Sequence, residues 1–234
     1  TAPEDAYVTH QEWDRNEHPE LSLEHGERIS MFLDCSLNDD STALVACRIS
    51  DGFVKPLGLW QKPAGERGKD WRVPRESVDD VVRTAFHTYD VVGFFGDPSH
   101  VLDSETGLRY WDALFDRWHR DYGRRLKTWA VPSGRDRHAV MFDMINTDIQ
   151  RRFVTAVDQA YTDITEGDFP HDGDARLRLH MLNARRQPTR VGMSIAKESR
   201  ESKRKIDLAI CAIGARMVRR EYLNRNSRSG GGQL

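Results

Sequence analysis

The chain has 234 residues, of which 38% are hydrophobic and 31% are charged, and its formal net charge is -2 at pH 7. These values suit one large domain with a substantial core, and they exclude a membrane-spanning helix, because no apolar run approaches the ~20 residues that one needs. We find no charged-then-apolar leader at the N-terminus, so we expect a soluble, intracellular protein. Cys35, Cys47 and Cys211 form no C-x-x-C pair and lie in apolar surroundings, which predicts buried free thiols without disulfides or zinc.

Charge is distributed unevenly along the chain. Residues 1–26 carry one base and seven acids, whereas residues 176–228 carry fifteen bases and four acids. A basic segment in a nearly neutral chain predicts a binding surface for a polyanion, and the acidic middle of the chain can hold metal ions. A solvated helical face is the common alternative for such a charge run, and it stays open here.

The first half of the chain predicts strands followed by a helix. Residues 1–26 are acidic and polar, and we expect a linker or arm that packs through Trp13. β-prone runs separated by turn residues then predict an antiparallel meander of three strands, over 29–33, 42–49 and 53–60. Apolar residues at helical spacing predict an amphipathic helix over 74–89, and a continuous apolar run predicts a buried strand over 91–95.

The second half of the chain predicts mainly helices. Apolar spacing indicates a helix over 111–122, and another strand is expected over 126–131. The remaining expected elements are a long helix from Met141 to Ile164, a basic helix over 175–186, a short strand over 191–195, a final helix over 204–222 and a disordered, Gly-rich tail over 225–234.

Three aspartates each lie at the edge of an apolar run, where a buried element should emerge into solvent. Asp34 ends 29–33, Asp97 follows 91–96, and Asp207 opens 208–213. Carboxylates that converge from distant parts of a chain are how a fold holds hard divalent cations, which take oxygen ligands and can activate water. Taken singly, each of the three also suits a structural role, as a strand end, a turn residue or a helix N-terminus.

The order of elements and several short words together resemble a known family. Three strands, helix-strand units and a late helix with an acid are the pattern of the RNase H-like fold. More narrowly, the chain resembles the C-terminal nuclease domain of the large terminase subunit of tailed bacteriophages, from Trp13 to about Arg220. The words that carry this resemblance are Phe32-Leu33-Asp34-Cys35-Ser36, Asp40-Ser41-Thr42-Ala43, Gly96-Asp97-Pro98, His180-Met181-Leu182-Asn183-Ala184 and Lys205-Ile206-Asp207-Leu208-Ala209.

The resemblance implies a fold, an activity and partners. The fold would be an α/β, RNase H-like domain over 27–224. Its central mixed sheet would have five or more strands, three antiparallel ones followed by parallel additions, and would be flanked by helices. The activity would be metal-dependent cleavage of concatemeric double-stranded DNA during genome packaging, in the cytoplasm of the infected bacterial host. The partners would be a packaging ATPase domain, a portal and a small terminase subunit, although this chain has no G-x-x-x-x-G-K-[ST] phosphate loop. Family members often have Glu in place of Asp97, and Gly or Val in place of Leu33.

The chemistry of a phosphodiester explains why acids are needed at such a site. Two cations can neutralise the phosphate and activate the attacking water, so we expect two Mg²⁺ or Mn²⁺ ions held by Asp34, Asp97 and Asp207. Asp34 is the candidate to bridge both ions because a central strand end is rigid. Asp40 is an auxiliary candidate with Asp39 behind it, and turn formation is the competing role for both.

The basic C-terminal region is the candidate DNA-binding surface. Its residues can contact phosphates without reading sequence, and they are Arg185, Arg186, Arg190, Lys197, Lys203, Arg204 and Lys205. Lys197 and Lys205 flank Asp207 in sequence and are expected nearest to the scissile phosphate. His180 and Asn183 stay open as site or packing residues. Two other functions also stay open: a resolvase-type or integrase-type nuclease of the same fold, and a catalytically silent DNA-binding module.

Overall fold

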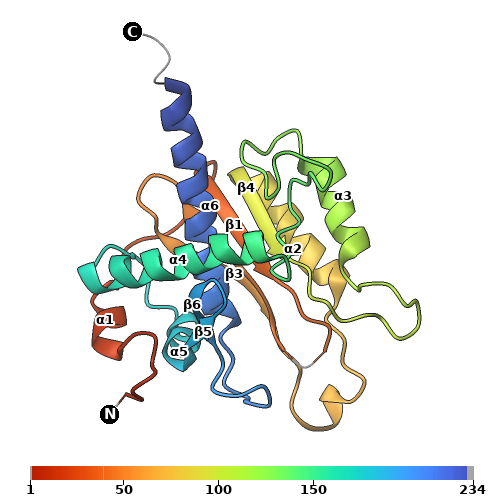
Figure 1. Ribbon diagram of the computed structural model, residues 1–234, viewed down its shortest axis with the longest axis horizontal. Coiled ribbons are helices and arrows are strands. Elements are labelled where there is room, and N and C mark those ends of the chain that lie inside the picture. The colour runs from red at the N-terminus through yellow and green to blue at the C-terminus, as the bar shows by residue number, and fades with distance from the viewer. Residues whose placement is uncertain (1, 39, 231–234) are drawn as a thin grey trace.

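A four-stranded mixed sheet forms the centre of the computed structural model, which describes residues 2–38 and 40–230. The strand order is β3-β2-β1-β4, in which β2 is antiparallel to both of its neighbours and β4 is parallel to β1 (Figure 1). The strands span Arg28–Asp34 for β1, Thr42–Arg48 for β2, Val54–Trp60 for β3 and Asp90–Asp97 for β4. The meander and the parallel fourth strand are therefore confirmed.

The expectation of five or more strands in this sheet is wrong for the described residues. Beyond β4 lie only isolated bridges, which join Gly93 to Thr128 and Gly96 to Met141. The expected strand over 126–131 is broken because the N–H groups of Lys127 and Thr128 both donate to the same carbonyl, that of Val92. After Pro132 the chain turns back, and it reaches β4 again only near Met141.

Helices cover both faces of the sheet (Figure 1). The side chains of α2 (Arg75–Thr88) and α3 (Asp112–Tyr122) pack against the inward residues of one face, such as Met31 and Phe94. The other face, which includes Phe32 and Phe95, is covered by α4 (Thr147–Glu166), α5 (Ala175–Asn183) and α6 (Asp207–Gly230). None of the helices in the described ranges combines the length and the apolar character that a bilayer span requires.

Three expected boundaries differ from the observed ones. α4 begins at Thr147 rather than at Met141, because the side chain of Asn146 caps the helix by accepting from the N–H groups of Asp148 and Ile149. The basic helix ends at Asn183, and the two-stranded hairpin of β5 (Arg185–Thr189) and β6 (Gly192–Ala196) follows it. α6 extends to Gly230, so 225–230 are helical rather than a disordered tail, and 231–234 lie outside the described residues.

The N-terminal segment packs into the core. It contains the short helix α1 (His10–Asp14). A 3-10 helix, η1 (Gly65–Gly68), lies elsewhere in the chain, after β3. Trp13 is fully buried and stacks on His171, with ring centroids 4.1 Å apart. The expected anchoring through Trp13 is thus present in the structure.

Close packing places α6 directly over β1. A Cβ atom at Gly214 would lie 2.4 Å from Cγ of Phe32, so only glycine permits this approach. The hydroxyl of Ser30 also donates to the carbonyl of Ala215 at 2.8 Å. Because side chains alternate along a strand, Asp34 lies on the same face as Phe32, and Asp97 on the same face as Phe95. Both aspartates therefore lie on the face that α6 covers.

Candidate metal centre

Asp34 and Asp97 are neighbours at the C-terminal edge of the sheet. They end the parallel strands β1 and β4 and are paired in register. Asp207 is the first residue of α6, which packs on the same face of the sheet. The three sequence-predicted aspartates, which come from distant parts of the chain, are thus brought to one edge of the sheet.

Within this group, Asp34 and Asp207 contact each other directly. Their carboxyl groups are hydrogen-bonded to each other, and the hydroxyl of Ser41 donates to Oδ2 of Asp207. Burial and the charges of Asp207 and Asp97 raise the pKa of Asp34 well above its ordinary value. Burial likewise raises the pKa of Asp207. The raised pKa values reflect negative charges that are buried close to one another.

Asp97 has a polar atom that the protein leaves unsatisfied. Its Oδ1 is shielded from solvent and has no hydrogen-bond partner within the described residues. Burial and the charge of Asp143 raise the pKa of Asp97 to about 7, although the backbone N–H groups of Ser99 and Met144 oppose the rise. A buried carboxylate oxygen without a donor costs free energy, so this atom calls for a cation or a proton.

Two further residues adjoin Asp97 that sequence reasoning missed. Ligand atoms of Asp97, His100 and Asp143 all lie within 4.8 Å of one another. Asp143 reaches this position because the carbonyl of Gly96 accepts from the N–H of Phe142 at 2.8 Å, which places 140–143 beside β4. The signal was present in the sequence: Asp143 follows the apolar run 139–142, as Asp34 and Asp97 follow theirs. We did not recognise this signal because the long helix expected from Met141 includes Asp143.

Two lysines form hydrogen bonds with the carboxylate of Asp40. Its Oδ1 accepts from Nζ of Lys197 at 2.5 Å and from Nζ of Lys205 at 3.0 Å. Although burial acts to raise the pKa of Asp40, these hydrogen bonds lower it below its ordinary value. Two of the expected DNA-contacting lysines therefore lie at the acidic group. Asp39, which was expected behind Asp40, lies outside the described residues.

A cleft of about 440 Å³ opens over the acidic group. Its lining combines carboxylates, a lysine and apolar side chains of the β5–β6 hairpin and α6, and includes Asp34, Asp40, Lys197, Ile195, Asp207 and Ile210. The carboxylates supply the oxygen atoms that hard divalent cations prefer. The donor set and the unsatisfied Oδ1 of Asp97 therefore fit such ions.

The other candidate residues have different surroundings. His180 is buried, and its Nδ1 accepts from the N–H of Leu208 at 3.0 Å, so its side chain supports the first turn of α6. Asn183 donates to the carbonyl of Lys205 at 3.0 Å. Arg185 is 6% exposed and pairs with Asp5, so its side chain is engaged within the fold. The exposed members of the basic set are Arg186, Arg190, Lys203 and Arg204.

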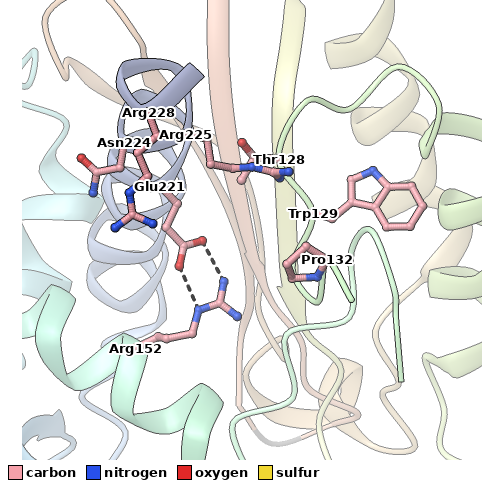
Figure 2. Close-up of a pocket in the computed structure, with 8 residues that line it drawn as sticks. All are labelled: Thr128, Trp129, Pro132, Arg152, Glu221, Asn224, Arg225 and Arg228. Carbon is pink, nitrogen blue, oxygen red and sulfur yellow. Dashed lines mark hydrogen bonds and ion pairs between the residues drawn. The ribbon is translucent and has the colours of Figure 1, made fainter. Parts of the chain in front are cut away.

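A second hollow, of about 430 Å³, lies along the C-terminal half of α6 (Figure 2). Figure 2 shows Arg152 of α4 and Glu221 of α6 turned toward each other, joined by two hydrogen bonds of 2.8 and 2.7 Å. Arg152 also donates to the carbonyl of Ala130 at 2.6 Å. Because these charges satisfy one another, they tie α4 to α6, and we assign the hollow no part in the chemistry.

Comparisons with known proteins give sequence relatives from mycobacteriophages and several structural relatives. No family model matches the chain. The chain is 37% identical over 244 residues to the Gene 13 protein of Mycobacterium phage L5, an alignment that covers 98% of this chain and 37% of that protein. The chain therefore spans little more than a third of the length of this curated relative.

The similar solved structures are phage large terminases. The HK97 bacteriophage large terminase matches with a TM-score of 0.60 and 16% identity, over 91% of this chain and 43% of that one. The large terminase nuclease from thermophilic phage G20c with bound magnesium matches with a TM-score of 0.55 and 11% identity, over 92% and 97%. The same nuclease with bound cobalt matches with a TM-score of 0.54 and 11% identity, over 92% of this chain and 97% of that one. The chain therefore has the RNase H-like α/β fold of phage large terminase nuclease domains.

Proposed function

We propose that the chain is the nuclease domain of a phage terminase large subunit, and that it cleaves double-stranded DNA concatemers during genome packaging. The observation that supports this most strongly is the row of carboxylates at one sheet edge, in which Asp34, Asp97 and Asp207 come from β1, β4 and α6. The 37% identity to a mycobacteriophage protein and the terminase-like fold support the same assignment.

In this proposal the three aspartates hold two divalent cations, Mg²⁺ or Mn²⁺, and Asp40 is an auxiliary ligand. Two bound cations neutralise the scissile phosphate and lower the pKa of the attacking water. Asp34 is paired in register with Asp97 and hydrogen-bonded to Asp207, so it is the residue that would contribute to both cation positions. The hydroxyl of Ser41 orients the carboxylate of Asp207.

The basic residues would hold the DNA. Lys197 lines the cleft and lies with Lys205 at Asp40, so the two ammonium groups are positioned to meet a phosphate that approaches the aspartates. Lys203 and Arg204 are exposed beside them in sequence and would contact the flanking backbone. A packaging ATPase domain, a portal and a small terminase subunit are the partners that we propose, with host cytoplasm as the place of action.

Cleavage of supercoiled plasmid tests the function. We expect nicking and linearisation with Mn²⁺ or Mg²⁺ and no cleavage with chelator. In Asp97→Asn the cleavage rate should fall at least about a hundredfold, because a lost ligand costs about 3 kcal/mol of transition-state stabilisation. Asp90→Asn is the matched control: Asp90 begins the same strand, is exposed and pairs with Arg28 at 3.2 Å. It should cut at the wild-type rate.

Each other outcome has a definite meaning. Cleavage that survives chelation, or that Asp97→Asn leaves unchanged, contradicts the proposed function. Tight DNA binding without cutting under any metal condition favours a silent binding module. Strong preference for a four-way junction over linear duplex favours a resolvase-type enzyme.

A further inference from the structure

The group formed by Asp97, His100 and Asp143 differs in chemistry from the pair formed by Asp34 and Asp207. It contains an imidazole, and its three ligand atoms lie within 4.8 Å of one another. In the order of the sheet, β4 separates β1 from the segment that carries Asp143. Asp97 is thus flanked by Asp34 on one side and by Asp143 on the other.

Ordinary structural roles account for part of this group but not for all of it. Asp143 accepts from Nη1 of Arg109 at 2.6 Å through Oδ2, and Arg109 also bonds Asp112 at 3.0 Å. This ion pair fixes the orientation of the Asp143 carboxylate. The N–H of Ile145 also donates to Asp143 Oδ1 at 3.2 Å. These bonds leave unexplained why Asp97 Oδ1 is buried with no partner within the described residues, while His100 Nδ1 faces Asp143 Oδ1 at 3.7 Å.

A cation between these groups would account for the unpartnered oxygen. It would supply a partner to Asp97 Oδ1, and the gap between His100 and Asp143 is wide enough for each to bind the ion rather than the other residue. The side chain of His100 is 46% exposed, so the position is open to solution. Arg109 would then hold Asp143 from behind, as outer residues orient metal ligands.

We propose that Asp97, His100 and Asp143 form a cation position that selects Mn²⁺ or another first-row transition ion over Mg²⁺. The selectivity follows from the imidazole, because nitrogen ligands suit transition metals, whereas Mg²⁺ prefers oxygen and retains its waters. This inference rests on the proposed function, because the position is that of the one of the two proposed cations that Asp97 holds. It adds two ligands, His100 and Asp143, and a preference between ions.

Direct Mn²⁺ binding tests the inference without measuring cleavage. Free Mn²⁺ is followed by electron paramagnetic resonance during titration of the full chain. We expect two bound ions in the wild type and one in Asp143→Asn. In His100→Ala the affinity of one position for Mn²⁺ should fall about tenfold or more. The affinity of that position for Mg²⁺, measured by competition with Mn²⁺, should change less than about threefold.

The matched control is Asp112→Asn. It also removes a carboxylate that contacts Arg109, but Asp112 is not a member of the cluster, so both ions should remain bound. Circular dichroism verifies that each variant is folded, and His100→Ala tests the position at an exposed side chain, where unfolding is least expected.

The outcomes separate this inference from the proposed function. Unchanged Mn²⁺ binding in both Asp143→Asn and His100→Ala overturns the inference, and it leaves the nuclease assignment standing if metal-dependent cleavage persists. Loss of one ion in these variants from a chain that never cleaves DNA supports the inference and contradicts the nuclease. No Mn²⁺ binding by the wild type at millimolar concentration overturns both.

Discussion

At the scale of single residues, His180 links the basic region to the acidic centre without being a candidate ligand. Its neutral imidazole accepts from the N–H of Leu208 through Nδ1, and burial lowers its pKa to about 4. The bond supports the helix turn that begins with Asp207, so a residue chosen from the sequence as a possible site residue acts through helix geometry. A histidine in the sequence is compatible with a site role and with a packing role, and only the contacts of His180 distinguish the two.

This buried histidine predicts a pH-dependent stability. Between about pH 6.5 and 4 the unfolded chain binds a proton at His180 while the folded chain does not, so acidification through this window lowers the free energy of unfolding, by about 3 kcal/mol in all. In His180→Asn, which can still accept from Leu208 but does not titrate, this part of the loss should be absent. Denaturant unfolding at a series of pH values measures the difference, and parallel curves for the two proteins would contradict it.

At the scale of elements, the β5–β6 hairpin and the segment that leads into α6 present the positive charge. β6 ends one residue before Lys197, and Lys203 and Arg204 precede the start of α6. Sequence reasoning placed Arg185 and Arg186 on a helix, whereas they begin β5. The error arose because a charged strand of five residues has no apolar period to distinguish it from the end of a helix.

Charge reversal at Lys203 should weaken DNA binding. We expect Lys203→Glu to lower the affinity for a linear duplex severalfold, and to reduce the slope of log affinity against log salt by about 0.9, because one phosphate contact is lost. Lys127→Glu is the control: Lys127 is exposed but lies beside Val92, near the other end of β4. Fluorescence anisotropy at several salt concentrations measures both, and equal effects of the two substitutions would argue against a specific surface.

At the scale of the whole molecule, the sequence predicted the order and direction of the strands β1 to β4 better than the chain that lies beyond β4. Alternation and buried apolar runs indicated β1 to β4, and the carboxylates that end β1 and β4 followed from them. The irregular chain beyond β4 could not be predicted, because shared hydrogen bonds at Val92 and a reversal after Pro132 break the strand. Asp143 was missed because the end of the apolar run that precedes it was assigned to the long helix expected from Met141, whereas a bridge places Met141 beside Gly96.

The most direct test of the central claim, that the carboxylates of β1, β4 and α6 share divalent cations, is a crystal structure from crystals soaked in Mn²⁺. The anomalous signal of manganese locates the ions independently of any activity. We expect density bound by Asp34, Asp97 and Asp207, with Asp34 contributing to two ions. Crystals that show manganese only elsewhere, or these three carboxylates turned away from one another and bound to no ion at millimolar Mn²⁺, would contradict it.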